Sequence, residues 1–218
     1  METLDLANAR WIDETNNKFK HQGLTVEDCI PPMYEAYAKV LHPFSIYQTR
    51  YEADHEINPT SISWQNTAEK YGMRFYAETN KISFVTHFED IGYPTDLYFP
   101  IEGILPRQLF VELLKVLESY TPSNEFIIYQ TAPYTIWKDE KVQDLVACNA
   151  DEVLTYFDKF FAGYLYAADK SWIIFTDCDL YFTIIGGTKE LVSALAESQL
   201  ETIICSNLSR VDEKGSMR

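Results

Sequence analysis

Residues 171–187 read S-W-I-I-F-T-D-C-D-L-Y-F-T-I-I-G-G and decide the fold of this chain. Two apolar runs, 172–175 and 180–185, flank a short polar segment and are rich in β-branched and aromatic residues, which favour a pleated, buried surface. Neither run alternates cleanly between apolar and polar residues, so both faces of the sheet should be covered. The sequence therefore predicts a central hairpin over residues 172–185, and any site should lie at one of its two ends.

The composition is that of a globular protein, since 46% of the 218 residues are hydrophobic and 23% are charged. This length suffices for one large domain or two small ones. No internal repeat, low-complexity block or clear linker divides the sequence, so we expect a single globular domain over residues 1–205. Residues 206–218 are polar and without apolar pattern, which predicts a disordered C-terminal tail.

Helix and strand signals alternate outside the hairpin. The clearest helix signal lies at residues 107–120, where apolar residues recur at intervals of three and four. Further helices are expected at residues 4–20, 25–28, 33–41, 64–71, 152–161 and 188–197. Strands are expected at residues 44–47, 74–76, 82–85, 126–129, 142–148 and 201–205, with irregular connections at 48–60, 88–100 and 132–140.

Several helix starts carry capping residues, which satisfy the free N–H groups of a first turn. These are Thr25 with Asp28, Asn149 with Glu152, and Ser61 or Ser63 before residue 64. The short connection of the hairpin makes its strands antiparallel. The sequence thus predicts the α+β class: a single domain with a mostly antiparallel or mixed sheet, a central hairpin from Trp172 to Ile185, and several packed helices.

The net charge is −15, from 33 acidic and 18 basic residues. Such a surface repels phosphate backbones and anionic lipids, so we expect neither a nucleic-acid nor a membrane partner. It would attract a basic protein partner, or it would serve solubility alone. The sequence leaves the oligomeric state open.

The four cysteines, Cys29, Cys148, Cys178 and Cys205, are far apart and form no C-x-x-C motif. The first residues show no basic region followed by an apolar one, so no signal peptide is expected. No apolar run has the length of a membrane-spanning helix. These features predict free thiols in a reducing cytoplasm.

Asp177 and Asp179 are the sharpest local feature, because two carboxylates flank the junction between the apolar runs. They could hold a cation through oxygen ligands, although calcium takes six to eight oxygens. The alternative is a tight turn, in which Asp accepts backbone hydrogen bonds. Cys178 between them is a poor nucleophile, because acidic neighbours disfavour its thiolate.

Gly186, Gly187 and Thr188 follow the second run and open a helix. Backbone N–H groups there could hold an anion at the helix N-terminus. The stretch lacks the lysine of a P-loop and the third glycine of a dinucleotide fingerprint, and the alternative is a backbone junction that needs glycine. No catalytic motif, metal signature or cofactor signature is present, so we expect no catalytic residue, metal or cofactor.

Four spaced features resemble a family of uncharacterised bacterial cytosolic proteins. They are Pro32 with Y-A-K-V-L-H-P at 37–43, Trp64 to Gly72, G-I-L-P at 103–106 with its leucine-rich helix and Thr121-Pro122, and Trp172 followed by T-D, Asp179, Thr183 and G-G. Residues 131–133 read T-A-P where relatives carry Trp-Glu-Gly. The resemblance implies a common structural unit and no specific activity.

Two functions remain open. The first is a non-enzymatic bacterial cytosolic protein that binds another protein, with a loose similarity in style to small acidic immunity proteins. It follows from the acidity, the aromatic content and the lack of a complete catalytic motif. The second is a hydrolase or transferase whose Asp/Glu acid–base residues come together from distant positions.

Overall fold

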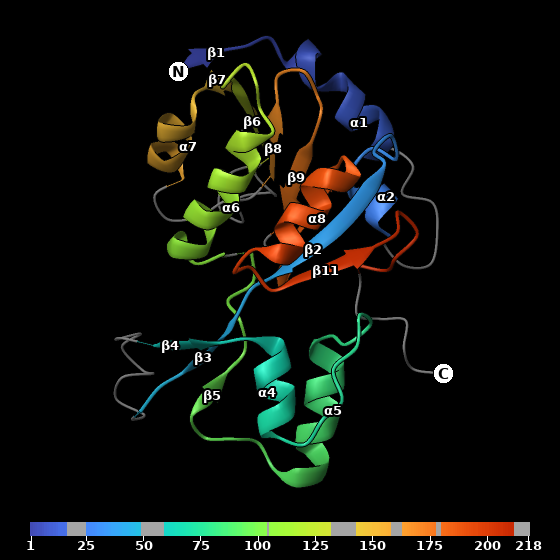
Figure 1. Cartoon of the computed structure of the whole chain (residues 1–218), viewed down its shortest axis with the longest axis vertical. Helices are drawn as coiled ribbons and strands as arrows, with labels where there is room; N and C mark the ends of the chain where they lie inside the picture. The colour runs from blue at the N-terminus through green and yellow to red at the C-terminus, as the bar shows by residue number, and fades with distance from the viewer. Residues whose placement is uncertain are drawn as a thin grey trace.

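The structure, a computed structural model, describes residues 1–16, 25–48, 59–103, 105–131, 143–157, 163–177 and 180–211. These residues form an antiparallel sheet of eight strands in the order β1-β7-β6-β8-β9-β10-β2-β11 and a second sheet of three in the order β4-β3-β5. Figure 1 shows the large sheet with most of the helices in its upper part and the small sheet with α4 and α5 below. The predicted α+β class with a mostly antiparallel sheet is confirmed.

The large sheet consists of β1 (Glu2–Thr3), β2 (Ala36–Leu41), β6 (Phe126–Thr131), β7 (Gln143–Cys148), β8 (Gly163–Ala167), β9 (Ile173–Thr176), β10 (Phe182–Gly187) and β11 (Thr202–Cys205). The small sheet consists of β3 (Phe44–Ile46), β4 (Thr60–Ile62) and β5 (Leu97–Tyr98). The helices are η1 (Leu6–Ala9), α1 (Arg10–Asn16), α2 (Val26–Cys29), α4 (Trp64–Lys70), α5 (Lys81–Ile91), α6 (Arg107–Ser119), α7 (Ala150–Tyr156) and α8 (Lys189–Glu197).

The predicted central hairpin is present as β9 and β10, with Ile184 opposite Phe175 in the register. Its strands lie in the interior of the large sheet and are buried on both faces, as expected. Ile174 packs on one face in a cluster with residues of α6, α7 and α8. Ile173 and Phe175 pack on the other face with residues of α1 and α2. Figure 1 shows α6, α7 and α8 along the large sheet.

The helix predicted at residues 33–41 is wrong, because residues 36–41 form β2 between β10 and β11. Tyr37 packs on the α1–α2 face and Val40 on the α6–α8 face. A strand buried on both faces carries a nearly continuous apolar run, and such a run matches helical spacing equally well. Pairing with two neighbouring strands therefore decided the structure of this segment.

The strand predicted at residues 82–85 is also wrong, since these residues lie in α5. Asn80 caps this helix by accepting a hydrogen bond from the Ser83 backbone N–H at 3.1 Å. Phe84 and Phe88, one turn apart, are both buried in the cluster beneath the small sheet. The strand predicted at residues 74–76 is absent. The connection predicted as irregular at residues 88–100 includes the last residues of α5 and the strand β5.

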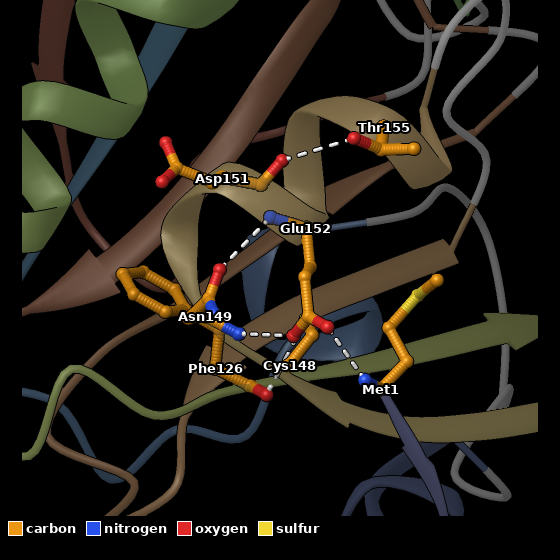
Figure 2. Close-up of polar contacts among 7 residues, drawn as sticks. All are labelled: Met1, Phe126, Cys148, Asn149, Asp151, Glu152 and Thr155. Carbon is orange, nitrogen blue, oxygen red and sulfur yellow. Dashed lines mark hydrogen bonds and ion pairs between the residues drawn. The ribbon is translucent and has the colours of Figure 1, made fainter.

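The predicted capping residues begin their helices. Ser63 accepts from the Asn66 N–H at 3.1 Å, and Thr25 and Asp28 form a capping box at α2. Figure 2 shows the box at α7, where Asn149 Oδ1 accepts from the Glu152 N–H at 3.0 Å. The Glu152 carboxylate also lies 2.6 Å from the Met1 amino group, beside the outer strand pair of β1 and β7.

Residues 206–211 contradict the disordered tail that the sequence predicts from residue 206. The Ser209 carbonyl accepts from the Val26 N–H at 2.9 Å, and Arg210 forms a β-bridge with Thr25. Val211 is buried in the cluster that contains α1 and α2. Residues 212–218 lie outside the described part of the chain, as do residues 49–58 of the connection predicted at 48–60 and the whole of that predicted at 132–140. Residue 60, at the end of the first connection, begins β4.

The small sheet is attached to the large one through a shared apolar cluster. Phe44 and Trp64 pack there with Leu41 of β2 and Tyr181, which precedes β10. The Glu201 carboxylate, just before β11, accepts from the backbone N–H groups of residues 64 and 65 at 2.7 Å each. These contacts fix the start of α4 to the segment before β11.

Candidate functional site: a groove between the large sheet and the start of α5

A groove of about 760 Å³ is lined by residues of β2, β10 and β11 and by residues 77–81, which lead into α5. Ser206 and residues 208–211 also line this feature, which we call the sheet–helix groove. Its apolar lining includes Leu41, Trp64, Phe182 and Ile203. Leu180 and Tyr181 also line it, so the groove lies at the turn end of the central hairpin.

Lys39 reaches the groove from β2, an interior strand. Its ammonium group donates a hydrogen bond to the Arg210 carbonyl and lies 4.7 Å from the centre of the Phe182 ring. Burial lowers the pKa of Lys39, and the nearby Cys205, Cys29 and Glu78 act in the opposite direction. Lys39 is therefore a partly desolvated cation that one wall of the groove holds in place.

Lys81, the first residue of α5, also lines the groove. Its ammonium group donates to the Tyr181 hydroxyl, which donates in turn to Glu102, and the Lys81–Glu102 ion pair measures 3.5 Å. The hydrogen bond to Tyr181 raises the pKa of Lys81. Burial raises the pKa of Tyr181, and its bond to Glu102 raises it further. At neutral pH the lysine is therefore charged and the phenol is neutral.

The charged side chains that line the groove among the described residues are mostly basic. They are Lys39, Lys81 and Arg210 against a single carboxylate, Glu78. Burial raises the pKa of Cys205, which also lines the groove, to about 11, so this thiol is neutral. The described lining thus has more basic than acidic side chains, in a chain of net charge −15, while the Glu102 carboxylate beside the groove pairs with Lys81.

Asp177 is half-buried at the turn of the hairpin, and its carbonyl accepts from the Leu180 N–H at 3.0 Å. This contact fits the turn that the sequence offered as one alternative. Cys178 and Asp179 lie outside the described residues, so the paired-carboxylate site stays a prediction. Within the described ranges, no cluster of three or more His, Cys, Asp or Glu side chains could hold a metal ion.

Gly186 and Gly187 lie at the end of β10 and permit close packing. A methyl group at Gly186 would lie 2.5 Å from Tyr34 Cδ2, and one at Gly187 would lie 2.6 Å from Leu191 Cδ2. The Thr188 hydroxyl caps α8 by accepting from the Leu191 N–H at 3.2 Å. Neither glycine has a positive φ, so glycine is needed here for the close approach of Tyr34 and Leu191 and not for an unusual backbone conformation. The anion site at residues 186–188 stays a prediction.

Three further buried groups, Cys29, Cys148 and His42, are neutral at physiological pH. Burial raises the pKa of Cys29 and of Cys148 to about 12. His42 is fully buried, and burial lowers its pKa to about 3. Its Nε2 lies 3.1 Å from the Thr183 hydroxyl, which lies 2.7 Å from the Thr176 hydroxyl. The imidazole and the two hydroxyls form a packed polar network. Neither this network nor the two neutral thiols offer an activated nucleophile or base.

The sequence did not reveal the groove residues, because Lys39, Lys81, Tyr181 and Arg210 come from four separate segments. No local spacing connects them, and each alone is an ordinary residue. The approach of residues 77–81 to β11 brings them together. The one usable signal was the turn end of the hairpin, which the groove adjoins.

No known protein family, characterised protein or solved structure matches this chain. The resemblance to uncharacterised bacterial cytosolic proteins therefore stays a prediction. Within the part of the chain that the structure describes, no helix is long and apolar enough to cross a membrane.

Proposed function

We propose that this chain is a non-enzymatic binding protein and that the sheet–helix groove is its binding site. The observation that carries the proposal is the groove itself, whose volume of about 760 Å³ falls within the usual range for ligand sites, roughly 300–1,000 Å³. Apolar walls with a few convergent polar groups are typical of such sites. The groove combines apolar side chains such as Phe182 and Ile203 with Lys39 and Lys81 in this way.

The protonation states favour binding over catalysis. A general acid or base works best with a pKa near the operating pH. The pKa values of Tyr181, Lys81 and Cys205 are all raised, so none of these three is tuned towards neutrality. Burial lowers the pKa of Lys39, and its ammonium group donates a hydrogen bond to the Arg210 carbonyl, a contact that suits a positioned cation.

Amide chemical shifts of the ¹⁵N-labelled protein test the site directly. We would add small organic fragments and map the shifts that each one causes. The expected result is a set of compounds whose shifts cluster at residues 203–211 and 79–81, with the amides of β1 and β7 unchanged. If no fragment shifts the groove amides, or if shifts spread evenly over both regions, the groove is not a binding site.

We also propose a basic protein partner for the acidic exterior, in an immunity-like role inside a bacterial cell. The net charge of −15 carries this second candidate, because such a charge accelerates association with a basic protein. Salt screens this attraction, so binding should weaken as the salt concentration rises. Affinity capture from a bacterial lysate at low and high salt is the test. A basic protein retained only at low salt is expected, and capture of none at low salt would contradict the proposal.

A further inference from the structure

We propose that the sheet–helix groove binds an organic anion, in which a carboxylate or similar group is carried on an apolar body. This inference rests on the proposed function of the groove as a binding site. It goes further by naming the chemistry of the occupant, which two properties of the walls define: an excess of positive charge and an apolar surface beside it.

The charge of the walls is the reverse of that of the whole chain. Acidic residues outnumber basic ones by 33 to 18 overall, whereas the described lining has three basic side chains and one acidic. Lys39 comes from β2 and Lys81 from the start of α5, and both line the groove, so two separate elements each offer an anion a cationic side chain. A charged group that leaves water needs such partners, because burial of an unpaired ion is costly.

Both lysines retain donors for a ligand. An ammonium group has three N–H donors. The described hydrogen bond of Lys39 to the Arg210 carbonyl uses one of them, and Lys81 directs its own towards Tyr181 and Glu102. The protein contacts therefore hold the ammonium groups in position and leave room for a charge-assisted hydrogen bond to an anion.

The apolar lining explains why the anion should carry an apolar body. Phe182 and Ile203 line the groove and are half-buried, and Ile204 and Leu208 are 57% and 64% exposed there. An inorganic anion would leave these surfaces uncovered, whereas an aromatic or aliphatic carboxylate would bury them and gain roughly 25 cal/mol per Å² of apolar area. The burial that lowers the pKa of Lys39 also reduces solvent screening of an anion beside it.

Two fluorescent probes of similar shape test the proposal: 8-anilinonaphthalene-1-sulfonate, which is anionic, and N-phenyl-1-naphthylamine, which is neutral. Both would be titrated into the wild type, Lys39→Met, Lys81→Met and the control Lys115→Met. Lys115 lies exposed on α6, pairs with Glu112 and does not line the groove. Each substitution changes the net charge by the same amount, so a difference between variants reports position.

We expect saturable binding of the anionic probe to the wild type and to Lys115→Met. Lys39→Met and Lys81→Met should each weaken binding of the anionic probe about tenfold, because each removes one charge-assisted hydrogen bond. The neutral probe should bind all four proteins alike. Lys39 holds the Arg210 carbonyl, so Lys39→Met could displace residues 206–211, and a lower melting temperature would show this. In that case Lys81→Met decides the outcome, because the Lys81 side chain bonds to Tyr181 and not to this segment.

The outcomes separate this inference from the proposed function. If the neutral probe binds as tightly as the anion and neither groove lysine matters, the groove binds ligands but has no preference for anions. If Lys115→Met weakens binding of the anionic probe as much as Lys39→Met and Lys81→Met do, net charge alone governs binding and the inference fails. If neither probe binds, the inference fails together with the proposed binding site.

Discussion

Removal of the buried imidazole should change how stability depends on pH, and His42→Gln is the variant that shows it. His42 is fully buried, its Nε2 lies 3.1 Å from the Thr183 hydroxyl, and its Nδ1 makes no well-formed hydrogen bond. Burial lowers its pKa from 6.5 to about 3, and the Ile101 backbone acts in the opposite direction. Glutamine can replace the contact to Thr183 but does not titrate.

The sign and size of the effect follow from that shift. Well above pH 6.5 the imidazole is neutral in both states and contributes nothing to the pH dependence. As the pH falls through 6.5, the unfolded chain binds a proton that the folded chain excludes until about pH 3, so stability is lost across that window. The loss is about 1.4 kcal/mol per pH unit, or about 1.3 kcal/mol between pH 7 and pH 5.5.

Urea unfolding of the wild type and His42→Gln at both pH values measures the difference. Carboxylates titrate in both proteins, so the wild type should lose about 1.3 kcal/mol more than the variant. Parallel losses would refute the reasoning. As an independent check, the NMR signals of the His42 ring should not titrate between pH 7 and pH 5.5, and a midpoint near 6.5 would also refute it.

Three further predictions concern packing, attachment and reactivity. Gly186→Ala should lower the free energy of unfolding by about 1–3 kcal/mol, because its methyl group would meet Tyr34, and an unchanged urea midpoint would contradict the packing role. Glu201→Ala removes the acceptor for the first N–H groups of α4, so hydrogen exchange at these amides should accelerate and the free energy of unfolding should fall by about 2 kcal/mol. The control Glu197→Ala, at an exposed position, should leave this exchange unchanged. At pH 8, iodoacetamide should modify Cys205 about 100-fold more slowly in the folded protein than in urea, because burial raises its pKa from 9.0 to about 11; equal rates, read by peptide mass spectrometry, would show an accessible thiolate.

The elements that local chemistry governs were predictable. The capping box of Thr25 and Asp28 and the cap at Asn149 act within four residues, so their helix starts follow from the sequence. The apolar hairpin was equally clear, because its two runs have strand composition and a short connection. Asn80 is a capping residue of the same kind. It begins the helix α5, so the strand predicted at residues 82–85 is wrong.

The sequence by itself determined the α+β class, the central hairpin and most helix starts, since those depend on neighbours along the chain. The tertiary structure alone decided that residues 36–41 form a strand, because their apolar pattern suits helix and strand alike and pairing with β10 and β11 selects one. It also decided the candidate site. Lys39, Lys81 and Arg210 line one groove although they are far apart in the sequence, and a site built from such distant residues has no local pattern.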